Sequence, residues 1–296
     1  MKDRTWSFIF CFGIFFPLMC QAVIMPQHNS LAFRSSSILN TLSSKDVQSV
    51  YQDRDGYIWI STRNGLFQYD GYSITTYKSN LYCPDLLSSN NIFCVAEDSC
   101  HRLWIGTYSG LNVLDKRTGE VRKIENAELS STGISQILVT SDQRILFATE
   151  AGLFEYQEND DTFLVYDASN TGGVFPSNTG GVFPRNTVKS LFEDDRGDIW
   201  IGTWNGGLYR YEKKTGKYWK YPRMNSGNSA HVVFQDSYKN IWVGTWGSGL
   251  HLLHNAYDPE RTTWTTFTHN EKQPYTISDN LIYAISEDVN NHSLWV

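Results

Sequence analysis

One short phrase recurs along this chain of 296 residues and limits what it can fold into. The phrase reads "YIWISTRNGLFQYD" from Tyr57, "RLWIGTYSGLNVLD" from Arg102, "DIWIGTWNGGLYRY" from Asp198 and "NIWVGTWGSGLHLL" from Asn240. Its tryptophan falls at Trp59, Trp104, Trp200, Trp242 and Trp295, with Leu146 in a degenerate third copy, at intervals of 45, 42, 54, 42 and 53 residues. Strand-like text with a period of about 40 to 50 residues is typical of β-propellers, in which each repeat forms a four-stranded antiparallel blade.

The strands of one blade can be read in the fourth copy of the phrase. There, "TVKSLFED", "IWIGT", "LYRYE" and "KYWKYP" are short, mostly alternating segments separated by turns. Aromatic residues make up 15% of the chain, which favours β structure because flat side chains pack well on pleated sheets. We therefore expect an all-β propeller with five full blades and half of a sixth, near 47–80, 90–126, 133–168, 186–222, 229–269 and 280–296.

The first 22 residues differ in character from the repeats. Lys2 and Arg4 precede "TWSFIFCFGIFFPLMC", an apolar stretch that is short for a membrane span and suits the core of a signal peptide. The sequence predicts a signal peptide at 1–22, a lead-in segment at 23–43 and propeller repeats at 44–296, and hence a periplasmic or extracytoplasmic protein. Cleavage after Ala22 fits the small-residue rule, while a cut at Val23 or Ser30 and an uncleaved anchor stay open.

The repeated tryptophans and acids are expected to be structural. A blade cannot bury its faces alone, so a large flat side chain at the same place in each blade, contributing about 2 to 3 kcal/mol, would wedge between successive sheets. We assign this role to Trp59, Trp104, Trp200, Trp242 and Trp295. An acid lies six residues before four of them, at Asp53, Asp98, Asp194 and Asp236. Because a catalytic carboxylate is needed once and not in every blade, we expect these acids to cap turns.

The first blade carries a more specific likeness. "VQSVYQDRDGYIWISTRNGLFQYDGYSITTYKSN", from Val47 to Asn80, resembles the opening of the periplasmic sensor region of hybrid two-component regulators, the two-component regulator propeller family. The strongest parts are "YQDRDGYIWIST" and "GLFQYDGY", and the likeness extends over about 39–296. The resemblance implies a seven-bladed ring, an oligosaccharide ligand, control of glycan-utilisation genes and a homodimer. It also implies a membrane helix and a histidine kinase beyond this sequence, so we expect the chain to be a fragment whose only membrane link lies in those absent regions.

One face of the propeller carries the variation expected of a binding site. The loops between second and third strands share this face, and they present aromatic, amide and guanidinium groups of the kind that stack on sugar rings and bind hydroxyls. The candidate ligand-binding residues are Arg63, Asn64, Tyr108, Trp204, Asn205 and Trp246. The alternative, that these side chains only cap the packing between blades, stays open.

Catalytic signatures are absent from the sequence. It has no G-x-S-x-G, H-E-x-x-H or P-loop motif, and no cofactor, metal site or catalytic residue is predicted. His251 and His254 lie three residues apart on a strand, so their side chains point to opposite faces and cannot share a metal ion. His231 is the one candidate for the alternative function, a secreted stand-alone propeller that binds carbohydrate or acts as a lyase or glycosidase.

Charge and cysteine content narrow the partners further. A formal net charge of −6 without a basic run argues against nucleic acid as a partner. Beyond the signal peptide three cysteines remain, an odd number with irregular spacing that does not make a disulfide framework. Cys94 is expected to be buried, and a bridge between Cys83 and Cys100 is left open.

Overall fold

The computed structural model describes residues 42, 46–83, 86–166, 187–221, 229–288 and 290–296. All of them belong to one compact unit, Arg34–Val296. The predicted signal peptide at 1–22 lies outside the described residues, as does the lead-in segment at 23–43 apart from Leu42. The described residues form 22 strands and one short 3-10 helix, Leu129–Ser131.

The strands form five four-stranded sheets and one two-stranded sheet, each antiparallel and each built from consecutive strands. Blade 1 contains β1 (Val47–Gln52), β2 (Ile58–Thr62), β3 (Gly65–Tyr69) and β4 (Ile74–Tyr77), and blade 2 contains β5 (Ile92–Glu97), β6 (Arg102–Thr107), β7 (Gly110–Asp115) and β8 (Val121–Lys123). Blade 3 contains β9 (Ile134–Val139), β10 (Ile145–Thr149), β11 (Gly152–Gln157) and β12 (Thr162–Tyr166). Blade 4 contains β13 (Val188–Glu193), β14 (Ile199–Thr203), β15 (Gly207–Glu212) and β16 (Lys217–Lys220). Blade 5 contains β17 (Ala230–Gln235), β18 (Ile241–Thr245), β19 (Leu250–His254) and β20 (Thr263–Phe267), and β21 (Ser286–Glu287) pairs with β22 (Leu294–Trp295) in blade 6.

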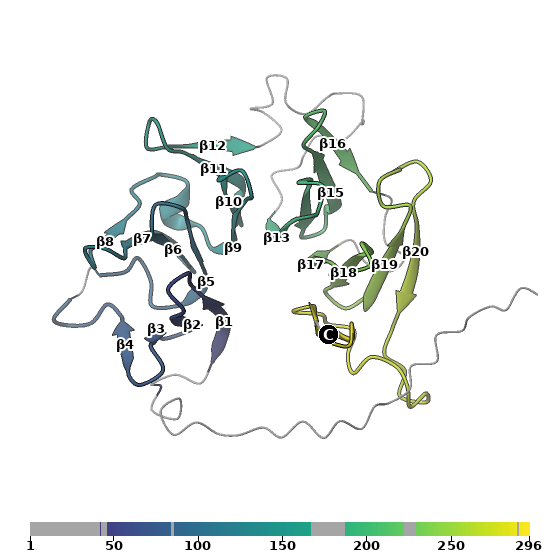
Figure 1. Ribbon diagram of the computed structural model, residues 1–296, viewed down its shortest axis with the longest axis horizontal. Helices are drawn as coiled ribbons and strands as arrows, with labels where there is room; N and C mark the ends of the chain where they lie inside the picture. Colours follow the sequence, from purple (N-terminus) through teal and green to yellow (C-terminus); the bar gives the residue numbers. More distant parts are fainter. Residues whose placement is uncertain (1–41, 43–45, 84–85, 167–186, 222–228, 289) are drawn as a thin grey trace, which may run out of the picture. The chain divides into compact units, whose positions relative to one another are not determined.

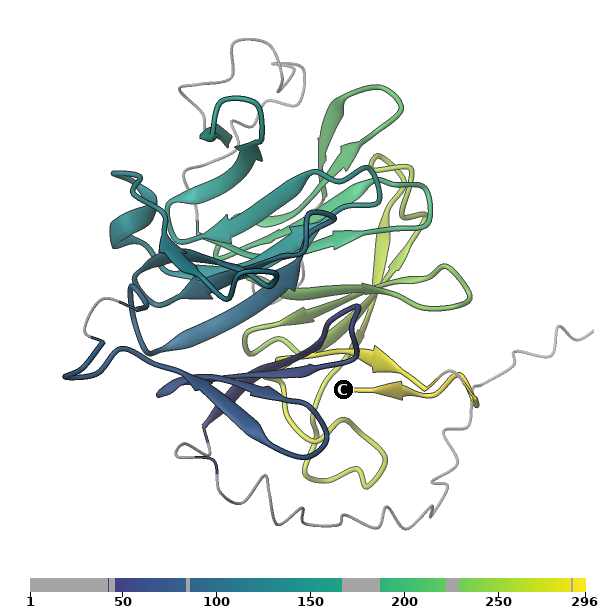
Figure 2. The same cartoon turned by 60° about the vertical axis from the view of Figure 1, so that its left-hand side comes forward.

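Successive blades pack against each other through their first strands. β1 contacts β5, β5 contacts β9, β9 contacts β13 and β13 contacts β17. Figure 1 shows these five strands on the inner side of the blades, with the fourth strands β4, β8, β12, β16 and β20 on the outer side. Figure 2 shows the sheets as successive twisted layers. The all-β, blade-type architecture predicted from the repeat is confirmed.

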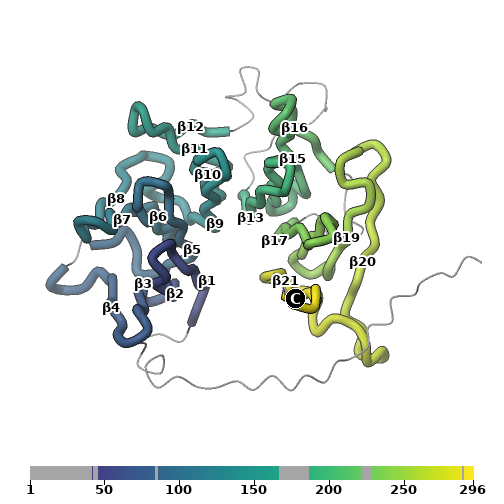
Figure 3. The backbone as a smooth tube through the Cα atoms, viewed as in Figure 1, coloured from purple at the N-terminus to yellow at the C-terminus, as the bar shows by residue number. Residues whose placement is uncertain are grey.

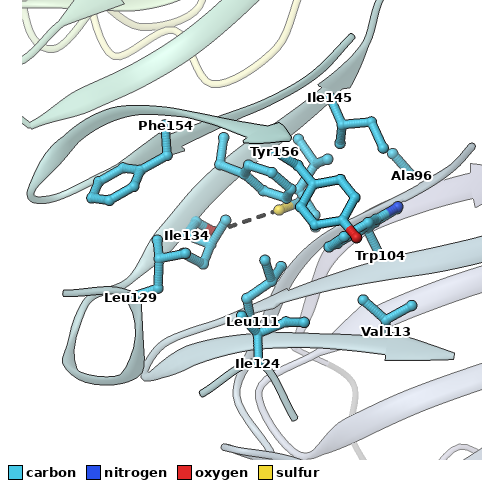
Figure 4. Packing of buried hydrophobic residues seen from close by; sticks show 13 residues of the cluster. Ala96, Trp104, Leu111, Val113, Ile124, Leu129, Ile134, Ile145, Phe154 and Tyr156 are labelled. Carbon is cyan, nitrogen blue, oxygen red and sulfur yellow. Dashed lines mark hydrogen bonds between the residues drawn. The ribbon is translucent and has the colours of Figure 1, made fainter. Parts of the chain in front are cut away.

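Three of the repeated tryptophans lie between two blades, as expected. Trp59, Trp104 and Trp200 are almost completely buried, and each belongs to an apolar cluster that combines its own blade with the next one. Figure 4 shows the cluster around Trp104, where Tyr156 of blade 3 packs against the indole and Ile145 of the same blade lies near Ala96. Every such contact buries a flat ring against two sheets, which is the wedge that the sequence predicted.

Two other tryptophans depart from that pattern. Trp242 is half-buried and packs against Leu250 and Ile282 between blades 5 and 6. Trp295 is 50% exposed, so the prediction that it is a buried wedge is wrong for this structure. The physical reason is that β22 pairs only with β21, and among the described residues no further sheet packs on it.

Each buried tryptophan is clamped by the acid six residues before it. One carboxylate oxygen of Asp53, Asp98, Asp194 and Asp236 accepts a hydrogen bond from the indole Nε1–H of Trp59, Trp104, Trp200 and Trp242, at 2.7 to 2.8 Å. The other oxygen accepts backbone N–H groups of the turn that follows, for example those of Tyr57 at 2.9 Å and Arg102 at 3.0 Å. The predicted turn cap is therefore correct, and the same side chain also satisfies a buried indole, which sequence reasoning missed.

The third blade replaces both members of this pair. Thr140 stands at the position of the acid and Leu146 at that of the tryptophan, which is again six residues later. The Thr140 hydroxyl still accepts the N–H of Arg144 at 2.9 Å and so caps the turn. A leucine side chain has no N–H group, so blade 3 needs no buried acceptor at the position of the acid. The turn nevertheless keeps its cap.

A second repeated contact connects neighbouring blades. A carboxylate or amide at the end of one first strand accepts a backbone N–H group from the first turn of the preceding blade. The pairs are Glu97 with Arg54, Glu193 with Ser141, Gln235 with Asp195 and Glu287 with Ser237, at 2.6 to 2.9 Å. These bonds add directional polar contacts to the apolar packing between successive sheets.

Gly202 shows why the repeated phrase carries a glycine two residues after its tryptophan. A Cβ atom at this position of β14 would lie 2.4 Å from the Ser190 hydroxyl oxygen and 2.7 Å from the Ala230 carbonyl oxygen of blade 5. The bare backbone therefore permits the close approach of the adjacent blade that the sequence predicted.

The cysteines of the described part are unpaired. Cys83 and Cys100 are free and exposed, so the bridge between them that the sequence left open is not formed in this structure. Cys94 is buried, and its thiol donates a hydrogen bond to the carbonyl oxygen of Ile134 at 3.4 Å. Among the described residues, no helix has the length and apolar character that a membrane crossing requires.

Candidate functional site

Each full blade carries a β-bulge near the start of its first strand. In β17, for example, Ala230 pairs with Thr245 and Val232 with Gly244, which leaves His231 between them without a partner in β18. The same shift occurs in all five blades, and the bulged residues are Gln48, Phe93, Ser135, Lys189 and His231. A bulge turns its extra side chain away from the regular ladder, so these five residues occupy equivalent, specially aimed positions.

The loop between the second and third strands is tied to the same place. Its first residue donates its backbone N–H to the carbonyl oxygen of the residue two positions before the bulge. The pairs are Arg63 with Asp46, Tyr108 with Asn91, Glu150 with Gly133, Trp204 with Thr187 and Trp246 with Ser229, at 2.8 to 3.4 Å. A buried threonine hydroxyl closes the loop from the other side, as Thr203 does by donating to the Gly207 carbonyl at 2.8 Å.

Bulge residue and loop residue thus form a pair in every blade, always fifteen positions apart in the sequence: 48 and 63, 93 and 108, 135 and 150, 189 and 204, 231 and 246. Three of these pairs make ring contacts. The Phe93 and Tyr108 rings meet edge to face at 6.2 Å, the Lys189 ammonium lies 5.9 Å from the Trp204 ring centre, and the His231 and Trp246 rings are 5.4 Å apart.

The pairs of blades 4 and 5 merge with one residue of blade 6 into a single aromatic cluster. We define this aromatic cluster as the rings of Trp204, His231, Trp246 and Tyr283. Trp204 lies 5.5 Å from Trp246, Trp246 lies 5.5 Å from Tyr283, and Tyr283 lies 5.7 Å from His231. Figure 3 shows β17, which carries His231, on the inner side, with β21 of blade 6 beside it.

The cluster is both exposed and firmly attached. Trp246 is 42% exposed and Tyr283 is 65% exposed, so ring surface faces solvent. The loop that carries Trp246 is joined to blade 6, because Trp246 and Leu281 form an antiparallel bridge and the N–H groups of Gly247 and Gly249 both donate to the Asn280 carbonyl oxygen, at 3.1 and 3.0 Å. Backbone hydrogen bonds on two sides hold the rings in place before any ligand arrives.

The charge at this site comes from one lysine. Burial, and secondarily the charge of Lys189, lower the pKa of His231, so the imidazole is neutral at physiological pH. In the described part of the chain no carboxylate oxygen lies within ion-pair distance of the Lys189 ammonium. Glu150, on the neighbouring loop of blade 3, turns its carboxyl group toward Gly133 instead.

The structure brings together only some of the predicted ligand-binding residues. Trp204 and Trp246 lie in the aromatic cluster. Arg63, Asn64 and Tyr108 lie on the loops of blades 1 and 2, so blade 3 separates them along the chain from the cluster of blades 4 to 6.

Asn205 has a structural contact at its own loop. Its carbonyl oxygen accepts the Ser229 hydroxyl at 3.3 Å, and its backbone N–H donates to the same hydroxyl oxygen at 3.1 Å. Since Ser229 lies just before β17, this side chain joins blades 4 and 5, which is the capping role that the sequence kept as an alternative.

A hollow elsewhere in the structure lies beside the first strands of blades 1 to 3. Its volume is about 660 Å³, and its lining includes Glu97, Gln136 and Glu193. These polar groups already bind one another's blades: Glu97 accepts the N–H of Arg54 and the Lys116 ammonium, Gln136 binds the backbone of Leu191, and Glu193 binds Ser141. Their hydrogen bonds hold the blades together, so the aromatic cluster is the better candidate for a ligand site.

A known protein family matches the segments of this chain that contain the bulges and the loops described above. The model of the family described as two component regulator propeller matches residues 41–64, 86–109, 183–205 and 226–247. These four segments are two-component regulator propeller repeats. Each regulator propeller repeat covers the first two strands of blade 1, 2, 4 or 5 and ends in the loop that carries the paired residue. Blade 3, which lacks the acid and the tryptophan, contains no matched segment.

Full-length relatives are larger than this chain. Histidine kinase P4 of Formosa agariphila is 33% identical over 54 residues, which are 18% of this chain and 4% of the kinase. The extracellular domain of the hybrid two component system BT3049 from B. thetaiotaomicron superposes with a TM-score of 0.64 at 20% identity, over 88% of this chain and 40% of its own. The extracellular domain of the hybrid two component system BT4673 from the same organism superposes with a TM-score of 0.58 at 22% identity, over 86% of this chain and 37% of its own. This chain therefore spans about two fifths of the two-component structures that it matches.

The same fold also serves an enzyme. Virginiamycin B lyase from Staphylococcus aureus superposes with a TM-score of 0.55 at 13% identity, over 75% of this chain and 70% of the lyase. At these identities all three solved structures establish the fold alone. The regulator propeller repeats, and not the superpositions, connect this chain to two-component regulators.

Sequence reasoning named the loop residue of four of the five pairs and assigned no ligand contact to a bulge residue. Lys189 and Tyr283 were not among the predicted residues, and His231 was named only as a candidate for catalysis. The fifteen-residue offset between bulge and loop residues was visible in the sequence, but its meaning depends on a bulge that strand-like text does not reveal.

Proposed function

We propose that this chain is the ligand-sensing propeller of an extracytoplasmic two-component sensor and that it recognises an oligosaccharide at the aromatic cluster. The observation that carries the proposal is the cluster itself, in which the exposed rings of Trp246 and Tyr283 adjoin the half-buried ring of Trp204. Regulator propeller repeats in the same loops support the sensor role.

The chemistry of the cluster suits a sugar. Apolar ring faces of a pyranose stack on indole and phenol rings, and such platforms with few polar groups at their edge are typical of small-ligand sites. Because the loop that carries Trp246 is fixed by backbone bonds from Gly247 and Gly249 to Asn280, little conformational freedom is lost when a ligand binds.

We propose binding and not catalysis for this face. General acid–base chemistry needs a proton donor or acceptor held by a partner group, as in an imidazole oriented by a carboxylate. His231 instead contacts the rings of Trp246 and Tyr283, and its Nδ1 atom has no hydrogen-bond partner in the described part of the chain. An imidazole stacked among rings supplies contact area to a ligand.

Isothermal titration calorimetry of the full chain against a panel of plant and host oligosaccharides tests the proposal. We expect one class of oligosaccharide to bind, and we expect Trp204→Ala and Trp246→Ala each to weaken that binding about tenfold, which corresponds to about 1.4 kcal/mol per lost aromatic contact. Thermal unfolding of each variant checks that it remains folded.

Tyr238→Ala is the matched control. Tyr238 is 68% exposed and lies between β17 and β18, a turn at the opposite end of blade 5 from the cluster. Its removal is expected to leave affinity unchanged. Folded tryptophan variants that bind as tightly as the parent, or a panel without any binding oligosaccharide, would contradict the proposed site.

A further inference from the structure

The charge beside the aromatic cluster selects among oligosaccharides, and this inference rests on the proposed function. We propose that the cluster takes an acidic oligosaccharide, one that carries carboxylate or sulfate groups, and that Lys189 binds the acidic group while Trp246 and Tyr283 contact the sugar rings. Neutral oligosaccharides would meet the same rings without this ionic contact.

The position of Lys189 supports a binding role over a structural one. It is the bulged residue of β13, half-buried, with its ammonium 5.9 Å from the ring centre of Trp204. A cation over an indole face is held in place without being neutralised, because the ring supplies a partial and not a full negative charge. Lys116, another half-buried lysine, is by contrast neutralised, since it contacts Asp53, Asp55 and Glu97 at 2.6 to 2.9 Å.

The surroundings leave that charge available. His231, the equivalent bulge residue of blade 5, stays neutral because it is buried and lies near Lys189. On the other side, the Glu150 carboxyl group is turned toward Gly133 in blade 3. In this arrangement no carboxylate of the described residues lies within ion-pair distance of Lys189, and a ligand in contact with Trp246 is suitably placed to bring one.

The rings and the cation form a continuous row. Lys189 touches Trp204, Trp204 lies 5.5 Å from Trp246, and Trp246 lies 5.5 Å from Tyr283. A short oligosaccharide along this row places one unit against the exposed rings and the next against the ammonium. Charge-assisted hydrogen bonds of this kind are about twice as strong as neutral ones, so one lysine suffices to discriminate.

Calorimetry with defined probes tests the inference on the full chain. The probes are oligogalacturonides for the carboxylate, chondroitin sulfate oligosaccharides for the sulfate, and galacto-oligosaccharides as the neutral reference. We expect at least one acidic probe to bind ten times more tightly than the neutral one, and binding to weaken as sodium chloride is raised. The two acidic probes distinguish the carboxylate from the sulfate.

Variants of the lysine separate charge from folding. Lys189→Met is expected to weaken binding of the acidic probe about tenfold and to reduce the salt dependence of that binding. Lys189→Arg is expected to keep most of the affinity. Lys214→Met is the control with the same change in net charge, since Lys214 is exposed in the turn between β15 and β16.

The outcomes distinguish this inference from the proposed function. Equal affinity for neutral and acidic probes, with an unaffected Lys189→Met protein, would overturn the acidic specificity and leave oligosaccharide binding intact. Loss of binding in the Trp246→Ala protein together with unchanged binding in Lys189→Met would have the same meaning. Absence of binding to every probe would overturn both.

Discussion

The hydrogen bond between the repeated acid and the repeated tryptophan can be removed by two substitutions that introduce the residues found at these positions in blade 3. In blade 4, Asp194 accepts the Trp200 indole N–H at 2.8 Å and the Tyr257 hydroxyl at 3.0 Å through one oxygen. Its other oxygen caps the turn by accepting two backbone N–H groups at 2.9 Å. The double variant Asp194→Thr with Trp200→Leu recreates the pair that blade 3 carries naturally.

The expected change in the free energy of unfolding follows from which buried groups lose their hydrogen-bond or packing partners. Asp194→Thr keeps a turn acceptor, as in blade 3, but leaves the indole N–H of a fully buried Trp200 without an acceptor, which costs about 1 to 3 kcal/mol. Trp200→Leu removes about half of a buried ring system and costs about 2 to 4 kcal/mol. In the double variant the stranded N–H no longer exists. The total loss is therefore expected to fall short of the sum by about 1 to 3 kcal/mol.

Urea unfolding of the full chain, followed by far-ultraviolet circular dichroism, measures this coupling. Tryptophan fluorescence is unsuitable because one substitution removes a tryptophan. The free energy of unfolding in water comes from linear extrapolation, with equal slopes required for all four proteins.

An exposed residue of the same blade supplies the control. Lys214 is exposed in the turn between β15 and β16, and Lys214→Ala is expected to change the free energy of unfolding by no more than about 0.5 kcal/mol. If the two clamp substitutions are additive within about 0.5 kcal/mol, the carboxylate does not serve the indole and the argument for the repeated acids fails.

Three further predictions concern single positions. Gly202→Ala is expected to lower the free energy of unfolding by about 1 to 3 kcal/mol in urea titrations, because the new methyl group meets the Ala230 carbonyl oxygen; an unchanged value would mean that the blades can separate freely. Because burial lowers the pKa of His231, its stabilising effect is complete above its ordinary pKa of 6.5 and is lost as the pH falls below that value. Comparing unfolding at pH 7 and pH 5, we expect the parent to lose more stability than His231→Gln, and equal losses would refute this role. Burial raises the pKa of Cys94 to about 12, so iodoacetamide at neutral pH should label the exposed Cys83 in the native protein and Cys94 only after unfolding, as peptide mapping by mass spectrometry would show.

Much of the fold was predictable from the sequence because the relevant interactions are local and repeated. Strand order, blade order and the position of the wedge follow from a phrase whose acid and tryptophan lie six residues apart in one hairpin, as with Asp98 and Trp104. Both residues of that hydrogen bond lie within two adjacent strands and the turn that joins them. A repeated local pattern needs no knowledge of the rest of the chain.

The candidate site was only half predictable, and the reason is physical. A loop aromatic such as Trp246 can be recognised from its exposed turn, whereas the aim of His231 depends on a one-residue bulge produced by the pairing of two strands. The same limit applies to Trp295, which repeats the phrase but is half exposed, because burial requires a neighbouring sheet and not a residue type.

The sequence by itself determined that this chain forms blades, how many strands each contains and which acids cap the turns. The tertiary structure decided that the loops of blades 4 and 5 and the segment before β21 join into one cluster of rings, and that Lys189 stands beside it without an acidic partner among the described residues. Distances within a hairpin are set by neighbouring letters, but contacts between blades arise only when whole sheets pack.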